Sequence, residues 1–572
     1  MGVSRYFRVE GPRRRGLTAG DLLVLTGVAG VLYIGLRLAF NAPEEVSGPT
    51  ISLQPSALPW YAFLSIGRMI AAYALSLVFS LIYGRVAANS RVAERVMLPL
   101  LDVLQSVPIL SFLPVVLLGL SAVLPTAWAA ELASVVLIFT SQVWNMTFAW
   151  YQSLTTLPGE LQEASSIFRL NSWLRFRFLE LPFAAIPLAW NSLMSWAGGW
   201  FFLMAAEMFT VGQRDFRLAG LGAYLQEAAN QNDLSAILFG LGALVLVIVI
   251  LDQFVWRPLL NWTNRFKLGM AQTEEENRSW FLQFMRGSNL FAWLKSLWLA
   301  GPENAIDRWM EGRAEESSKR TEVVRKSLGW RLLKFGMVVF FAILTYFMTA
   351  SLIAVPFEDW RLILIGLGAT LLRVSVALVL ALLWTVPVGV AIATNRRLSA
   401  FFQPLAQIMA SVPSTALFPV FVLFIIGMPG GLNLAAVLLM LTGSQWYLLF
   451  NVIAGANAIP EDLRYTATLL NLSRSERWRT LILPALFPYL VTGAITASGG
   501  AWNASIVAEY IEFGGETLST TGIGSIIAQA TADGRYPQLI AATMAMVVSV
   551  VLINRIFWRR LYTASEEIYR ME

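Results

Sequence analysis

The 572-residue chain contains neither cysteine nor histidine. Without cysteine it can form no disulfides, hold no iron–sulfur cluster and use no thiolate in catalysis. Without histidine it lacks the commonest metal ligand and the side chain that most often serves as a general base. The sequence also has no Gly-x4-Gly-Lys-Ser/Thr segment, and so no P-loop of its own for binding a nucleotide. We therefore predict that this chain has no catalytic residues, no metal site and no bound cofactor.

Charged residues are scarce, whereas hydrophobic residues make up more than half of the chain. The charged fraction is 14% and the hydrophobic fraction is 57%, with a mean hydropathy of +0.62. A soluble domain cannot bury so much apolar surface, so the composition predicts an integral membrane protein. The net charge of +6 is modest and gives no indication of nucleic-acid binding.

Hydropathy divides the chain into two sets of six apolar segments, each about 20 residues or more and long enough to cross the hydrocarbon core. The predicted spans are 21–40, 61–84, 96–120, 128–150, 182–206 and 234–256, followed by 332–354, 361–393, 403–427, 432–455, 484–508 and 536–557. Arginine is concentrated on one side of them, for example at Arg13 to Arg15, whereas segment 41–59 on the other side has no Lys or Arg. Positive charge marks the cytoplasmic side, so both termini are predicted to be cytoplasmic.

The chain repeats itself, and the repeat includes a polar loop between the fourth and fifth spans of each set. Pro460 of the second loop lies 302 residues after Pro158 of the first, and this offset holds from Trp144/Trp446 to Trp256/Trp558. Upstream, Arg68/Arg373 and both Ser-Val-Pro segments are separated by 305 residues. Since six is even, the two halves share one orientation and are predicted to be related by a pseudo-twofold axis along the membrane normal.

The repeated loop resembles the Glu-Ala-Ala-x3-Gly loop of ABC-importer permeases, and the wider pattern resembles their nitrate/sulfonate/bicarbonate (taurine-like) branch. The loop motif is Glu163-Ala164-Ser165, then Leu170-Asn171 and Leu181-Pro182. Further support comes from the Ser-Val-Pro segments, Gly220-Leu221-Gly222 and Val255-Trp256-Arg257-Pro258-Leu259. The resemblance covers about 200 residues of each half and is strongest to a duplicated, fused permease subunit.

The resemblance implies an all-α integral membrane protein of two tandem six-helix type I ABC-importer permease domains. The expected division is a cytoplasmic N-terminus at 1–20, permease domains at 21–262 and 332–562, a cytoplasmic or interfacial linker at 263–331 and a cytoplasmic tail at 563–572. The coupling loops are expected at about 155–181 and 457–483. Within the linker, bulky apolar residues from Trp280 to Trp298 are interrupted by Arg286 and Lys295, which favours a helix on the inner membrane surface.

The same resemblance implies the function and the partners. Two cytoplasmic ABC ATPase subunits are expected to bind ATP and Mg²⁺, and a periplasmic or lipid-anchored binding protein is expected to deliver a small anion. The chain itself would move that anion across the cytoplasmic (inner) membrane of a prokaryote by alternating access. The alternative is a twelve-helix secondary transporter coupled to H⁺ or Na⁺, which needs intramembrane carboxylates; here Glu207 and Glu509 are the only strong repeated acids.

Contacts with the ATPases are expected at the two loops. The expected coupling residues are Glu160, Glu163, Ala164, Arg169 and Leu170 in the first loop and Glu461, Tyr465, Ala467, Asn471 and Leu472 in the second. Three of them depart from the family pattern, since Arg169 and Asn471 occupy the glycine position and Tyr465 replaces the glutamate. The two ATPase contacts are therefore expected to be inequivalent.

Candidate residues of the translocation path come from polar or helix-breaking residues inside the spans. They are Arg68, Ser106, Pro108, Glu207, Arg373, Ser411, Pro413 and Glu509. Each proline falls near the middle of a predicted third span, where it either exposes a pore-facing carbonyl or makes a packed kink. The two arginines either attract an anion, pair with Glu207 and Glu509, or extend their guanidinium groups to the interface.

Overall fold

The computed structural model describes residues 46–106, 108–211, 214–266, 349–425, 427–513 and 516–568, together with residues 30, 33–34 and 346. The predicted first span of each half and the linker with its aromatic segment lie almost entirely outside these ranges. Among the described residues, seven helices are long and apolar enough to cross a membrane, or eight if one sharply bent helix pair is counted as a single span. The chain is thus a multi-pass, all-α membrane protein.

The first half consists of long helices with one broken helix, one loop helix and one small hairpin. Its elements are η1 (Pro55–Ala57), α2 (Leu58–Asn89), α3 (Arg91–Ser106), η2 (Ile109–Phe112), α4 (Leu113–Ser121), α5 (Thr126–Thr155), α6 (Gly159–Ile167), α7 (Ser172–Arg175), η3 (Phe176–Glu180), α8 (Leu181–Glu207), β1 (Thr210–Val211), β2 (Arg214–Asp215), α9 (Leu221–Asn230), α10 (Leu234–Leu251), η4 (Asp252–Trp256), α11 (Arg257–Thr263) and η5 (Asn264–Phe266).

The second half repeats this order. Its elements are α16 (Phe357–Thr394), α17 (Arg396–Ser411), α18 (Ser414–Ile425), α19 (Gly431–Asn457), α20 (Glu461–Leu469), α21 (Arg474–Arg477), η6 (Trp478–Ile482), α22 (Leu483–Glu509), β3 (Tyr510–Phe513), β4 (Glu516–Ser519), α23 (Ile523–Ala532), α24 (Tyr536–Ile553), η7 (Asn554–Trp558) and α25 (Arg559–Ile568). Both hairpins are antiparallel. Even the π-helical turns η3/η6 and η4/η7 recur at the offset of 302 residues found in the sequence.

The third span of each half, predicted at 96–120 and 403–427 with an exposed carbonyl or a kink at its proline, is broken into separate helices. In the second half, α17 and α18 are bent by 84° at the break. Proline has no backbone N–H and disfavours helical backbone in the residue before it. Val412, which precedes Pro413, accordingly adopts an extended conformation with φ −75° and ψ 117°. In the first half, α3 ends at Ser106 and η2 begins immediately after Pro108.

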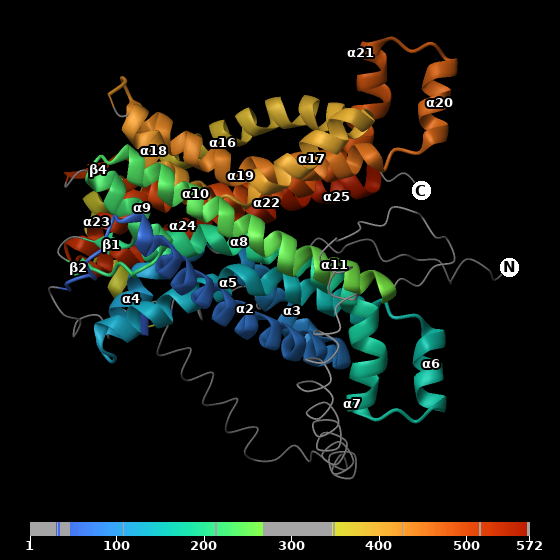
Figure 1. Ribbon diagram of the computed structural model, residues 1–572, viewed down its shortest axis with the longest axis horizontal. Coiled ribbons are helices and arrows are strands. Elements are labelled where there is room, and N and C mark those ends of the chain that lie inside the picture. Colours follow the sequence, from blue (N-terminus) through green and yellow to red (C-terminus); the bar gives the residue numbers. More distant parts are fainter. Residues whose placement is uncertain are drawn as a thin grey trace.

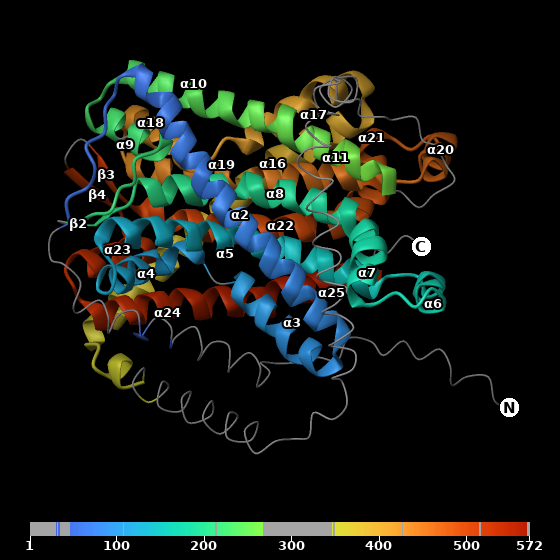
Figure 2. The same ribbon diagram turned by 60° about the horizontal axis from the view of Figure 1, so that its bottom comes forward.

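Each broken span packs against the opposite half. In the first half, α3 contacts α24 and η2 contacts α22; in the second, α17 contacts α8 and α10, and α18 contacts α8 and α9. One large hydrophobic core accordingly combines residues of both halves, including Leu110, Leu137, Phe418 and Trp502. In Figure 2, α24 of the second half runs beside the first-half helices. The fused halves thus form one intertwined unit.

The two ends of the molecule differ. Helices α6 and α7 of the first half and α20 and α21 of the second project from one end, which we call the loop end (Figure 1). The hairpins β1–β2 and β3–β4 lie at the opposite end, the hairpin end, with α9 and α23 beside them (Figure 1). The molecule therefore presents a repeated feature to each side of the membrane.

Candidate functional site

A buried ion pair ties the last turn of α8 to α2 near the hairpin end. Arg68 donates from Nη1 to Glu207 Oε1 at 2.8 Å, and from Nε and Nη2 to Glu131 at 2.7 and 2.6 Å. Glu207 also accepts from the Ser65 hydroxyl at 2.7 Å and from the Gly222 N–H at 2.8 Å. The Glu207 side chain is completely buried, so these donors replace the water that its charge would otherwise require.

The second half contains the equivalent assembly with one difference. Arg373 donates to Glu509 at 2.8 Å, and Glu509 accepts from the Thr370 hydroxyl at 2.6 Å and the Gly524 N–H at 2.8 Å. The position of Glu131 is taken by Asn433, which accepts from Arg373 Nη2 at 2.6 Å. The first assembly thus holds two carboxylates around its arginine, whereas the second holds one.

The sequence left three possible environments for the two arginines. In the structure, each arginine pairs with the glutamate at the end of the fifth span of its own half. Glu131 and Asn433, which complete the assemblies, were not singled out from the sequence. Their spacing of 302 residues could have pointed to them, but one is acidic and the other neutral. A role of these arginines and glutamates in the translocation path stays a prediction, and their contacts by themselves give them a structural role.

Glycine is required beside these carboxylates. A Cβ added to Gly524 would lie 2.8 Å from both the Ser505 carbonyl oxygen and the Ile506 Cα, which are backbone atoms of α22 and cannot easily move. We expect Gly524→Ala to destabilise the purified protein by roughly 1–3 kcal/mol through overpacking, measured by thermal unfolding in detergent. Gly368→Ala is the control, because nothing lies within 4 Å of its added Cβ. Equal unfolding temperatures for the two variants would contradict this explanation.

Each of the two repeated loops contains a short helix, α6 in the first and α20 in the second. In the first loop, α6 buries only Ser165; in the second, α20 buries only Ala467. Of the predicted coupling residues, six are exposed: Glu160, Glu163, Arg169, Glu461, Tyr465 and Asn471. Ala164, Leu170 and Leu472 are half-buried. The loop helices therefore present most of these side chains to the surroundings.

Arg169 and Asn471, which occupy the glycine position of the family's loop, both have an unusual backbone conformation. Arg169 and Asn471 have φ values of 48° and 51°, in the left-handed region where glycine is favoured. Each follows the end of its loop helix, where such a residue closes the last turn. Both positions thus have a backbone geometry that favours glycine, but their side chains add a cation in one loop and a neutral amide in the other.

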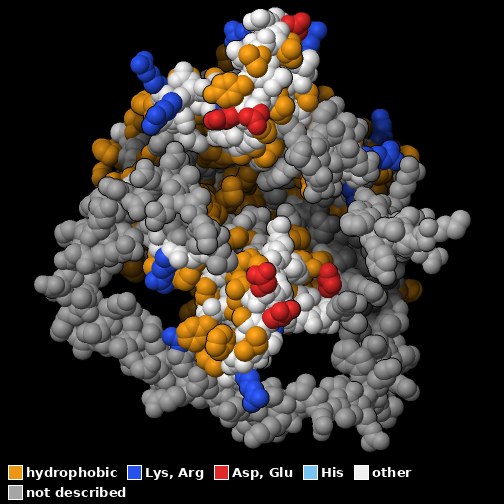
Figure 3. Space-filling view, turned by 90° about the vertical axis from the view of Figure 1, so that its right-hand side faces the viewer, with side chains coloured by type: hydrophobic (Ala, Val, Ile, Leu, Met, Phe, Trp, Pro, Cys, Tyr) orange, Lys and Arg blue, Asp and Glu red, His pale blue; other side chains and the backbone are white. Residues whose placement is uncertain are grey.

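Large apolar side chains are exposed at the tips of both loops. Ile167 and Phe168 are 78% and 76% exposed, and their counterparts Leu469 and Leu470 are 81% and 67% exposed. Figure 3, which looks onto the loop end, shows hydrophobic and acidic side chains together on both projections. These four residues were not predicted from the sequence, although each apolar residue of the first loop has an apolar counterpart 302 residues later. A repeated exposed apolar pair indicates a surface that another protein covers.

The loops are anchored differently at their bases. Glu180 is buried and forms ion pairs with Arg85 at 3.0 Å and Arg175 at 3.2 Å. In the second loop, the guanidinium of Arg464 instead donates to the carbonyl of Ala456. The side chains of Ser473 and Glu476 form a capping box at the start of α21. The first loop is thus fixed by buried charge and the second by backbone contacts.

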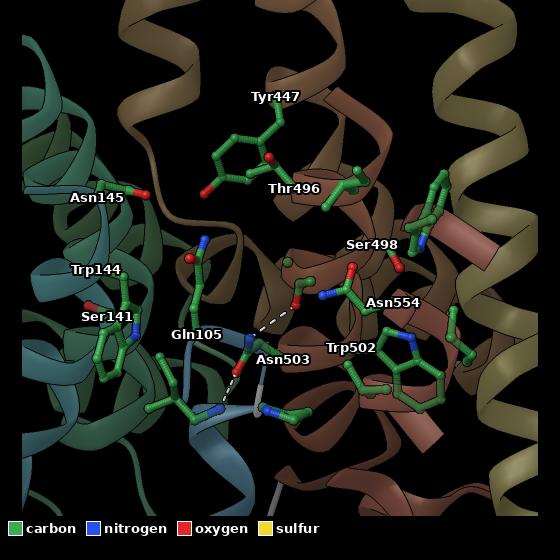
Figure 4. A pocket seen from close by; sticks show the side chains of 18 of the residues that line it. Gln105, Ser141, Trp144, Asn145, Tyr447, Thr496, Ser498, Trp502, Asn503 and Asn554 are labelled. Carbon is green, nitrogen blue, oxygen red and sulfur yellow. Dashed lines mark hydrogen bonds between the residues drawn. The ribbon is translucent and has the colours of Figure 1, made fainter. Parts of the chain in front are cut away.

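A cavity of about 530 Å³ lies between the two halves. Ser141, Trp144 and Asn145 of the first half face Thr496, Ser498, Trp502 and Asn503 of the second across it (Figure 4). Asn503 bridges the halves, because its Oδ1 accepts from the Ile109 N–H at 2.7 Å, one of the donors freed by the break after Pro108. Such a bridge requires both halves to be folded together.

The predicted path residues at the two proline breaks differ in whether they line the cavity. Pro108 lines the cavity, whereas the side chain of Ser106 lies outside the described part of the structure. Pro413 is buried, and the Ser411 hydroxyl donates to the Gln407 carbonyl of its own helix at 2.9 Å. Of Pro108, Ser411 and Pro413, whose side chains the structure describes, only Pro108 lines this cavity. Contact of any of these residues with a transported solute stays a prediction.

Two stretches of the chain, residues 76–255 and 385–562, match the model of the family described as binding-protein-dependent transport system inner membrane component. Together they cover more than half of the chain. The chain belongs to this family. It carries the family's domain twice, in agreement with the resemblance stated from the sequence, and both matched ranges lie within the two predicted permease domains.

Curated relatives each match about one third of this chain. The bicarbonate transport system permease protein of Synechococcus elongatus is 29% identical over 217 residues, which is 36% of this chain and 73% of that protein. The nitrate import permease protein of Leptolyngbya laminosa is 28% identical, over 33% of this chain and 64% of its own length. The taurine transport system permease protein of Escherichia coli is 24% identical, over 34% and 67%. The chain is therefore a permease subunit of a binding-protein-dependent importer, formed by fusion of two such permeases.

Proposed function

We propose that this permease imports a small anion, using two cytoplasmic ABC ATPases that dock at α6 and α20. The observation that carries the proposal is the pair of loop helices, which project from one end of the molecule with exposed apolar tips at equivalent positions. A twelve-helix secondary transporter would have no reason to present the same apolar pair on both halves. Family membership likewise favours the importer over that alternative.

The nature of the solute is inferred from the relatives. Their printed names refer to bicarbonate, nitrate and taurine. Bicarbonate and nitrate are anions, and taurine carries a sulfonate group. A small solute bearing negatively charged oxygens is the chemistry common to these names.

Coupling follows from how each loop helix is connected. In the first half, α6 leads through α7 and η3 directly into α8, and in the second half α20 leads through α21 and η6 into α22. Closure of the two ATPases on ATP and Mg²⁺ would move both loop helices, and each would move the long helix that follows it. Since α22 contacts η2 of the first half and α8 contacts α18 of the second, such motion would change the contact between the halves. This is the basis for alternating access.

The remaining assignments follow from this orientation. The loop end faces the cytoplasm of a prokaryote, and the hairpin end faces the binding protein, which is periplasmic or lipid-anchored. The chain binds no ATP itself; its partners hydrolyse it. Lipid surrounds the spans, whose outward side chains include Trp60, Phe63 and Leu372 at 59%, 64% and 66% exposure.

Removing the apolar tips tests the docking proposal. Phe168→Ser combined with Leu470→Ser is expected to reduce co-purification of the ATPase at least about tenfold, because an interface that buries two such side chains loses several kcal/mol. The effect should be insensitive to salt. Val123→Ser is the matched control, since Val123 is 65% exposed and lies just after α4, far from the loops. Undiminished ATPase binding by the double variant, in a correctly folded preparation, would refute docking at these tips.

A further inference from the structure

The short segment that joins the first loop helix to α8 is fixed to the loop end of α2. We call this segment, α7 with η3, the first elbow (residues 172–180), and its counterpart, α21 with η6, the second elbow (residues 474–482). In both ribbon views, α2 runs from the hairpin end of the molecule to the first elbow (Figures 1 and 2). The residue of α2 that makes the contact is Arg85, which lies close to the last turn of the helix.

Arg85 contacts the first elbow in three ways. Its Nε lies 3.0 Å from Glu180 Oε2, its Nη2 donates to the Ser172 carbonyl at 2.7 Å, and its guanidinium lies 5.4 Å from the centroid of the Phe176 ring. Arg175 adds a second positive charge, with its Nε 3.2 Å from Glu180 Oε1. The two Nε atoms lack hydrogen-bond geometry, so charge attraction holds these ion pairs. Because the side chain of Glu180 is only 5% exposed, its charge depends on the two cations.

A second buried ion pair joins the same two helices near their other ends. Arg68 of α2 pairs with Glu207, the last residue of α8, whereas Glu180 immediately precedes the first residue of α8. Arg68 and Arg85 are about 25 Å apart along α2, since a helix rises about 1.5 Å per residue. Charged pairs therefore clamp α2 and α8 to each other near both ends.

The second half keeps the clamp near the hairpin end, between Arg373 and Glu509. At the loop end, Val390 and Ile482 stand where the first half has Arg and Glu. Val390 is buried in a hydrophobic cluster against which Ile482 and Trp478 of the second elbow pack. Apolar packing thus replaces the ion pairs at this end of the second half.

The two kinds of contact respond differently when an elbow is displaced along the helix that it touches. Apolar packing is non-directional, so the second elbow can slide along α16 while its side chains stay buried. A buried carboxylate that moves away from its cations loses their compensation, which costs free energy. The first elbow therefore resists sliding along α2.

We propose that Arg85 is a positioning residue for coupling. Through Glu180 it makes α2 and α8 move as one rigid pair when an ATPase moves α6, so that displacement of the first loop reaches the hairpin end through both helices. In the second half, α22 can shift relative to α16. The inference rests on the proposed docking of ATPases at the loop helices and deepens it, because it makes the first half the stiffer lever.

Neutralising Arg85 tests this positioning role. The readout is the solute taken up per ATP hydrolysed by vesicles that contain the full chain, its ATPases and its binding protein, with nitrate, bicarbonate and taurine each supplied as the solute. Arg85→Gln is expected to lower this ratio at least about threefold, because part of the motion of α6 is lost in sliding. Glu180 keeps Arg175 in this variant, so the chain should still fold. Arg85→Lys keeps the charge and should stay within about 1.5-fold of the wild-type ratio.

The matched control is Arg397→Gln, because Arg397 is exposed at the start of α17, just beyond the loop end of α16. This variant loses the same charge at the equivalent end of the second half and should keep the wild-type ratio. Co-purification of the ATPases should be the same for all of these variants, because the exposed tips of α6 and α20 are unchanged. A lower ratio at equal ATPase binding is therefore a loss of coupling.

A double substitution separates positioning from simple anchoring. Arg85→Val with Glu180→Ile installs the residues of the second half, and Arg175, which is 38% exposed, can then reach water. If the contact only anchors the elbow, apolar packing should restore both the unfolding temperature and the ratio. If Arg85 positions the elbow, the double variant folds and binds the ATPases but keeps a ratio at least about threefold below that of the wild type. The double variant also gives the answer if Arg85→Gln fails to fold.

The outcomes are separable. Equal ratios for Arg85→Gln and Arg397→Gln, or a wild-type ratio for the double variant, would overturn the positioning role while leaving ATPase docking and import intact. Undiminished ATPase binding after removal of the apolar tips at Phe168 and Leu470 would overturn the docking proposal, and this inference with it. Absence of ATP-dependent uptake of all three solutes by the wild-type chain would likewise overturn the anion-import proposal and the inference. A lower ratio for Arg85→Gln and for the double variant, at unchanged ATPase binding, supports both.

Discussion

Glu509→Ala is expected to destabilise the protein more than Glu207→Ala, although the two glutamates occupy equivalent positions. Removing one partner of a buried ion pair leaves the other charge uncompensated, at a cost of about 3–5 kcal/mol. After loss of Glu509, the partners that Arg373 keeps among the described residues are neutral, namely Asn433, Thr520 and the Thr521 carbonyl. After loss of Glu207, Arg68 still has Glu131 at 2.6 Å. Thermal unfolding of the purified chain in detergent gives the comparison.

A second substitution provides the control for this prediction. Asn433→Glu supplies the carboxylate that the first assembly has at this position, so it should restore part of the stability lost in Glu509→Ala. Conversely, Glu131→Asn in the Glu207→Ala background should make the first assembly as unstable as the second. If Glu509→Ala and Glu207→Ala lower the unfolding temperature equally, the remaining carboxylate of Glu131 does not compensate Arg68.

Charge reversal at Glu163 is expected to lower substrate-stimulated ATPase activity and uptake together, with a strong dependence on salt. Glu163 is exposed on α6, and an interfacial charge whose partner is left buried and unpaired costs on the order of 2–5 kcal/mol. Its counterpart Tyr465 is 65% exposed and carries no charge. Tyr465→Ala should therefore weaken the second contact through lost packing, with little dependence on salt.

Thermal unfolding is the control measurement for these two variants, because the side chains of Glu163 and Tyr465 are both exposed and belong to no hydrophobic core. Both variants should unfold at the wild-type temperature. Equal effects at Glu163 and Tyr465 that do not change with salt would mean that the difference between the loops has no consequence for coupling. Full activity of both variants would mean that other residues of the loops bind the ATPases.

The sequence revealed those features that depend on local pattern. Apolar length predicted the spans, and the repeat located the two polar loops, in which α6 and α20 begin one residue after Pro158 and Pro460. The resemblance also identified Arg169 and Asn471 as occupants of a glycine position, and the structure shows that both have a left-handed backbone. The prolines of the Ser-Val-Pro segments indicated an exposed carbonyl or a kink within each third span, but hydropathy, which measures apolar length, did not predict that the helix ends there.

Only the tertiary structure decided which side chains meet. Glu131 lies on α5, 63 residues after Arg68, and Asn433 lies in the first turn of α19, 60 residues after Arg373. Each completes the arginine assembly of its half from a separate helix. The exchange of broken spans between the halves and the cavity between them likewise depend on long-range packing, which a repeat in the sequence cannot specify. A repeat fixes what each half resembles, whereas packing decides what surrounds each side chain: it places the carboxylate of Glu131 against Arg68 and the neutral amide of Asn433 against Arg373.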